Sequence, residues 1–244
     1  MNAALRSEIR KVLSLRSTYV IIGLLALFTL IMNGWVMGYK HGPLDGTFVA
    51  GLIRASFQGV SFLLGLIVLL HVTHEYRYNT IYYTMTLARS RTTIFFAKVF
   101  VATLIMLAGA ALFAALGVAS GLAGVAASGD SLGAQSIAWS NLLTHGGVYA
   151  WGAGMYALII GFIFRNQVGA IVVYLFGANI AEQLLWLLLK SNAGYLPFRA
   201  LEGTLMQGQM EGAFNPEKSM AIVLGWIVLA GTTAWFLFRY RDAN

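Results

Sequence analysis

HEYRYNTIYYTMTLARSRTTIFFAKVF, residues 74–100, is a charged, tyrosine-rich segment that lies between two long apolar runs. Each run reaches the roughly 20 residues that a helix needs to cross the hydrocarbon core of a bilayer. A charged segment between two such runs lies at a membrane surface, where water and lipid headgroups solvate it. The same alternation recurs along the chain and predicts an all-α, polytopic membrane protein.

The composition favours the same fold class. Of the 244 residues, 59% are hydrophobic and 10% are charged, whereas a soluble domain carries about 25% charged residues. We therefore expect one transmembrane domain over residues 1–244, with no room for a sizeable soluble domain. The chain has no cysteine, which excludes disulfides and thiol catalysis. The net charge of +7 fits loops that face anionic lipid, so a lipid membrane is the expected partner and nucleic acid is not.

Six segments are long and apolar enough to be spans: 19–38, 48–72, 94–119, 148–164, 168–189 and 220–238. For the third, a continuation toward Ala127 is the alternative. Placing the N-terminus in the cytoplasm puts eleven Lys and Arg residues inside and five outside. This bias predicts a multi-pass protein of the cell membrane with both termini cytoplasmic. The connection over 190–219 is predicted to hold short interfacial or re-entrant helices.

The first 17 residues are predicted to form an amphipathic helix in the cytoplasmic interface. Leu5, Ile9, Val12 and Leu13 fall on one helical face, and the arginines lie largely elsewhere. The alternative is a basic tail that only sets the topology.

The opening stretch itself predicts a short helix in residues 74–93. Tyr78, Ile81, Tyr82 and Met85 have the spacing of one apolar stripe. Such a helix would lie flat on the membrane and offer its other face to the cytoplasm. Lys98, just inside the third span, is predicted to snorkel to the headgroups. The alternative is a basic topology loop whose tyrosines form an aromatic belt.

This segment resembles the cytoplasmic segment of the type-2 family of ABC transporter permeases. Members commonly read Glu-aromatic-Arg-x-x-Thr-Ile, then a polar stretch, then Ala-Lys at the third span. The matching residues are Glu75, Tyr76, Arg77, Thr80, Ile81, Ala97 and Lys98. The motif covers about 25 residues, and the order of an N-terminal helix and six spans is also similar. The family's usual proline is replaced here by the sequence ARSR.

The resemblance implies the membrane half of an ATP-driven exporter of a hydrophobic or amphipathic substrate, such as a drug, lipid or peptide. Two permease subunits, alike or related, would pair and bind separate ATPase subunits that carry ATP and Mg²⁺. The short helix would be the coupling helix that enters a groove of the ATPase. The implied coupling residues are Glu75, Arg77, Asn79, Thr80, Tyr83, Thr86, Arg89 and Arg91.

Motifs for chemistry in this chain itself are missing. The sequence holds no G-x-x-x-x-G-K-[ST], so this chain is not expected to hydrolyse ATP or to act as an enzyme. His71, His74 and Glu75 have the wrong order for a zinc-binding H-E-x-x-H, and no metal site or cofactor is predicted here.

Glu182 is the one carboxylate well inside a predicted span, with Asn179 and Gln183 near it. An intramembrane acid is a functional-site hypothesis, so these residues are candidates for a translocation path. The alternative is a Glu182 nearer the outer interface that bonds to a residue of the outer connection. Rival functions are an ATP-independent transporter or channel, and a non-transporting immunity or sensory subunit.

Overall fold

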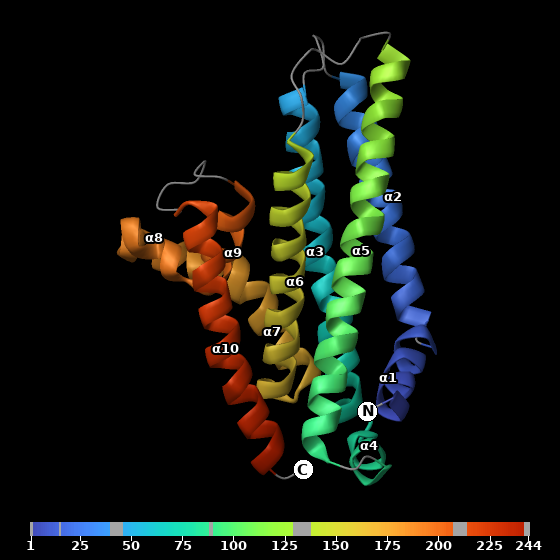
Figure 1. The fold of residues 1–244 in the computed structure, drawn as a ribbon, viewed down its shortest axis with the longest axis vertical. Helices are drawn as coiled ribbons and strands as arrows, with labels where there is room; N and C mark the ends of the chain where they lie inside the picture. The colour runs from blue at the N-terminus through green and yellow to red at the C-terminus, as the bar shows by residue number, and fades with distance from the viewer. Residues whose placement is uncertain are drawn as a thin grey trace.

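The computed structural model describes residues 2–14, 16–39, 46–87, 90–128, 138–206 and 214–241. Within those ranges all regular secondary structure is helical, which confirms the all-α fold class. Four of the described helices are long and apolar enough to cross a membrane: α3 (Gly46–Arg77), α5 (Arg91–Ser128), α6 (Trp139–Phe164) and α10 (Pro216–Tyr240). Figure 1 shows α3, α5 and α6 side by side, with α10 packed on α6 and tilted relative to it. This arrangement fits a multi-pass membrane protein.

The chain starts with a bent pair of helices, α1 (Asn2–Ser14) and α2 (Arg16–Tyr39). Their axes differ by 61°, and α2 packs along α5 (Figure 1). The pair would count as a fifth span if taken as one unit.

The predicted span over 168–189 is broken in the structure. It consists of α7 (Gln167–Phe176), a π-helical turn η1 (Gly177–Ala181) and α8 (Glu182–Leu189). With 10 residues, α7 is too short to cross about 30 Å of hydrocarbon. Figure 1 shows α8 extending away from the bundle. Six complete spans therefore stay a prediction.

Two short helices follow in the described part of the connection before α10. They are the 3-10 helix η2 (Lys190–Tyr195) and α9 (Pro197–Met206), and α9 packs on α6 and α10. Residues 207–213 of this connection lie outside the described structure.

The core lies where α6 packs against α3 and α5, and glycines set how close the helices come. A Cβ added at Gly146 would lie 2.8 Å from the ring of Phe57 in α3, closer than real Cβ contacts. At the next residue, Gly147, no atom lies within 4 Å of such a Cβ. One face of α6 is thus packed on α3 without room for a side chain, while the neighbouring position is open.

A short helix, α4 (Ile81–Leu87), closes one end of the bundle between α3 and α5. The turn before it passes through Asn79, whose φ of 53° is left-handed. Asparagine tolerates this conformation better than most residues, so it can end α3 and redirect the chain. The first turn of α1 and the last turn of α10 lie at this same end (Figure 1), which is called the α4 end below.

Candidate functional site

Five ionisable side chains from three helices meet beside α4. This ionic cluster comprises Glu8 and Lys11 of α1, His71 and Glu75 of α3, and Lys98 of α5. The Lys98 ammonium lies 2.6 Å from the Glu8 Oε2 atom and 2.8 Å from the Glu75 Oε1 atom. The Lys11 ammonium lies 2.6 Å from Glu8 Oε1 and 2.7 Å from Glu75 Oε1. The Nε2 atom of His71 lies 2.9 Å from Glu8 Oε2.

Four members of the ionic cluster are buried, and Lys11 lies at its edge with 32% of its side chain exposed. The exposed fractions are 0% for Lys98, 2% for Glu8 and 5% for Glu75. Two carboxylates face two ammonium groups, and each carboxylate contacts both. Removing one member of such a buried group leaves an unpaired charge, which is far more costly than the intact pair is stabilising. The cluster therefore fixes how α1, α3 and α5 sit against each other.

One expectation about these residues is wrong. Lys98 does not snorkel, because its ammonium bonds two buried carboxylates instead of reaching the headgroups. On α1, Glu8 and Val12 are buried against the rest of the protein, whereas Ile9 and Leu13 are 37% and 57% exposed. The apolar side chains of an interfacial helix face lipid, so the predicted apolar face of α1 stays a prediction.

Polar and apolar contacts hold the helix α4 to the bundle. Lys11 donates to the Thr84 hydroxyl over 3.1 Å, which joins α4 to the ionic cluster. Ile81 is 1% exposed, and Met85, one turn on, packs against the core. These two positions of the predicted stripe pack against the protein, whereas Tyr78 and Tyr82 are 61% and 44% exposed, so the stripe stays a prediction there.

The outer surface of α4 and its entry turn is aromatic and polar. Tyr83 is 72% exposed, and Asn79, Thr80 and Thr86 are exposed beside it. Together with Tyr78 and Tyr82 these side chains define the α4 surface. Four of the predicted coupling residues thus gather there.

The other predicted coupling residues lie elsewhere. Glu75 is in the ionic cluster, and Arg77 donates to the Gln167 side chain at the start of α7 over 3.0 Å. Arg91 donates to the main-chain oxygens of Arg239 and Arg241, at 3.1 and 2.9 Å. Arg89 lies outside the described residues.

The last turn of α10 is capped by arginines from two other elements. Besides Arg91, Arg165 donates to the Leu237 carbonyl oxygen over 2.8 Å. Positive side chains satisfy the free carbonyls at a helix C-terminus and interact favourably with its dipole. Arg91 therefore links the start of α5 to the end of α10.

Glu182 caps a helix of the connection before α10. Its two carboxylate oxygens accept the backbone N–H groups of Phe198 and Arg199, at 3.0 and 2.8 Å. These are the first free N–H groups of α9, which favour a negative charge. Gln183 accepts from the Arg199 guanidinium over 3.4 Å, and the side chain of Asn179 lies outside the described structure.

Sequence reasoning missed Glu8, Lys11 and Arg165. One signal for Glu8 was present, because it is an acid within a basic segment and Lys11 follows it by three residues. Among the described residues, no group of three or more His, Asp or Glu side chains is arranged to hold a metal ion.

A protein-family model described as "Protein of unknown function (DUF2705)" matches residues 44–243. The match covers α3 to α10 and leaves α1 and α2 outside it. No curated protein matches the chain.

Proposed function

The chain belongs to the family described as Protein of unknown function (DUF2705), and we propose that it is the membrane subunit of an ATP-driven ABC transporter. Its substrate would be hydrophobic or amphipathic, and a separate subunit would bind and hydrolyse ATP. The observation that carries the proposal is the α4 surface. The short helix α4 is held to the bundle through the ionic cluster on one side and exposes tyrosines on the other.

The chemistry of the α4 surface suits a protein partner. Tyr78, Tyr82 and Tyr83 expose 61%, 44% and 72% of their surface. Tyrosine is enriched among the residues that dominate binding energy in protein interfaces, because its ring is large and its hydroxyl finds a polar partner. Three neighbouring exposed rings therefore offer a partner protein a large area to bury.

The contacts that hold α4 suit the transmission of a movement from α4 to the long helices. Ile81 and Thr84 join α4 to the core and to Lys11, and the ionic cluster joins Lys11 to α3 and α5. A partner that displaced α4 would therefore move the ends of α1, α3 and α5 together. Transmission between distant sites needs such a chain of packed and hydrogen-bonded groups.

The membrane arrangement in this proposal has six spans, with α2 as the first and the broken α7–η1–α8 segment as the fifth. The α4 end would be cytoplasmic, and two permease chains would pair. Reporter fusions after Arg16, Arg91 and Arg241 should then report cytoplasm, and fusions at Asp130 and Gly208 should report the outside. A cytoplasmic report at Gly208 would contradict the six-span arrangement.

The main experiment is affinity purification of the tagged chain from its own cells in mild detergent. We expect a protein with a P-loop to co-purify and the eluate to hydrolyse ATP. Replacing the exposed tyrosine of α4 by Tyr83→Ala should weaken the association by about 2 kcal/mol or more, as for other central interface tyrosines.

The matched control is Tyr195→Ala, which removes a tyrosine of 50% exposure from η2, outside the α4 surface. It should leave the co-purified ATPase unchanged. If wild-type protein brings down no P-loop protein, the transporter proposal fails and an ATP-independent function is favoured. If Tyr83→Ala and Tyr195→Ala behave alike, α4 is not the docking surface.

A further inference from the structure

A second feature lies away from the α4 end, where α3, α6, α7 and α9 meet. It is a cavity of about 170 Å³, whereas roughly 10–15 Å³ on such a measure suffices for one water molecule. The side chains that give it its chemistry are Gln58, Phe62, Tyr149, Tyr174, Phe198 and Glu202.

Aromatic rings form a fixed wall of this cavity. The rings of Phe62 and Tyr174 stack with their centroids 4.7 Å apart, and Phe198 meets Tyr174 edge-on at 5.9 Å. The Tyr174 hydroxyl donates to the Phe62 carbonyl oxygen over 3.1 Å, which holds the ring in place. Gly65 makes this approach possible, because a side chain there would collide with the tyrosine hydroxyl.

The cavity is lined by one acidic side chain. Among the described residues that line it, Glu202 is the one charged side chain, and no Lys, Arg or His is present. Arg199 lies one turn earlier in α9, but its guanidinium bonds Gln183 and lies 5.2 Å from the Trp186 ring centre. Burial raises the pKa of the Glu202 carboxyl, and the positive charge of Arg199 only partly offsets this rise.

We infer that this cavity is a binding site for a small organic cation, an ammonium group of about the size found in choline. Such a cation is attracted to aromatic rings and pairs with a carboxylate. The cavity is lined by the partly exposed rings of Phe62 and Phe198 and by the Glu202 carboxyl. Water could solvate Glu202 and Gln58, but it would gain nothing from the stacked rings. The inference goes beyond the proposed function and needs only this chain.

The test is calorimetric titration of the purified full chain in phosphatidylglycerol nanodiscs. The probe is choline, and the comparison is its uncharged isostere, in which carbon replaces the quaternary nitrogen. We expect choline to bind at least about tenfold more tightly than the isostere, because both cation–π attraction and ion pairing need the charge. Equal binding of the two, or no binding of choline, would overturn the inference.

Variants locate the site. Glu202→Gln keeps the size and polarity of the side chain and should weaken choline binding by about tenfold or more, because the ion pair is lost. Phe62→Leu should weaken it several-fold. The control is Glu217→Gln, which removes an exposed carboxylate of α10 outside the cavity and should leave binding unchanged. Unchanged binding in Glu202→Gln would refute the assignment.

The ammonium group could belong to a free solute or to a lipid headgroup. Repeating the titration in phosphatidylcholine nanodiscs separates these sources, because a headgroup that occupies the cavity would compete with free choline. Lost binding in phosphatidylcholine assigns the site to the lipid, and retained binding assigns it to a solute. The wild-type choline and isostere comparison uses no ATPase, so its failure would leave the transporter proposal standing.

Discussion

Replacing Lys98 by methionine tests whether the ionic cluster holds the helices together. Methionine keeps the length and apolar stem of lysine but removes the ammonium that lies 2.6 Å from Glu8 and 2.8 Å from Glu75. Lys11 then faces both buried carboxylates alone, and one negative charge is left uncompensated. Breaking a buried pair in this way costs about 3–5 kcal/mol. At about 2–4 °C per kcal/mol for a chain of this size, the melting temperature should fall by roughly 6–20 °C.

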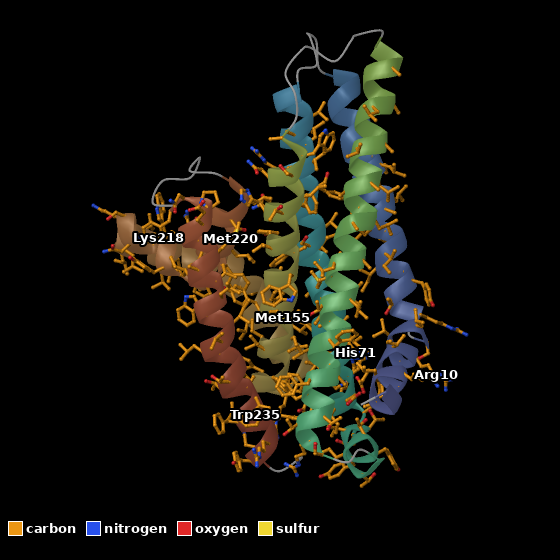
Figure 2. The ribbon with its side chains drawn as sticks, in the orientation of Figure 1. Arg10, His71, Met155, Lys218, Met220 and Trp235 are labelled. Atoms are coloured by element: carbon orange, nitrogen blue, oxygen red, sulfur yellow. The ribbon has the colours of Figure 1, made fainter. Side chains whose placement is uncertain are left out.

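Thermal unfolding in detergent, followed by tryptophan fluorescence, measures this change. Arg10→Met is the matched control, because it removes an exposed positive charge that points away from the bundle (Figure 2). Its melting temperature should stay within about 2 °C of the wild type, since surface substitutions cost little. The double variant Lys98→Met/Glu75→Gln restores the charge balance and should recover part of the loss. A Lys98→Met variant as stable as Arg10→Met would refute the reasoning.

Gly146→Ala should destabilise the chain by about 1–3 kcal/mol, because its new methyl group meets the Phe57 ring. The control Gly147→Ala should be neutral or slightly stabilising. Equal melting temperatures of the two variants would contradict the packing of α6 on α3. Glu182→Gln should lower the free energy of unfolding by about 1–3 kcal/mol, because it removes one of two acceptors at the start of α9. Limited proteolysis near α9 should then become faster. Unchanged protection from proteolysis together with altered transport would instead favour a role in the translocation path. Asn79→Gly should leave the melting temperature unchanged, because glycine tolerates the left-handed turn. Asn79→Val should lower the free energy of unfolding by roughly 1–2 kcal/mol, because valine is strained there. A valine variant as stable as the wild type would show that the turn can change its conformation.

The long apolar runs were readable from the sequence, and their limits were not. The runs at 48–72, 94–119, 148–164 and 220–238 lie within α3, α5, α6 and α10. Each helix extends past its run. The helix α5 runs on through the mostly apolar residues 120–127, which was the alternative for the third predicted span. In α3, backbone hydrogen bonding continues where the side chains turn polar. Thus α3 runs on through His74 to Arg77. Hydropathy identifies the apolar part of a helix but does not show where the backbone hydrogen bonds of the helix end.

The ionic cluster could not be predicted from periodicity, because its contacts join distant parts of the chain. Glu8 bonds residues that follow it by 63 and 90 positions. Local spacing assigns faces to one helix at a time, so it missed Glu8 and predicted that Lys98 reaches the headgroups. Spacing also left open whether Tyr78 and Tyr82 pack on the protein. Tyrosine fits apolar patterns, but its hydroxyl allows it to stay exposed.

The break at η1 had no sequence signal strong enough to end the predicted span. Residues 168–189 are apolar throughout apart from a few amide and acidic groups, and no proline interrupts them. A π-helical turn inserts one extra residue per turn and shifts the face of everything after it. The position of Glu182 follows from that shift together with its two bonds to α9, which no count of residues reveals.

The buried cluster also sets an order of events during synthesis. Glu8 and Lys11 are made first, His71 and Glu75 later, and Lys98 last. A nascent chain that has inserted α3 but not α5 holds two carboxylates against one ammonium, so docking of α1 would bury an unpaired charge. Stable docking of α1 therefore waits for α5 to enter the membrane. A chain stalled before that point keeps α1 undocked at the membrane surface, where proteases that remove incomplete membrane proteins can reach it.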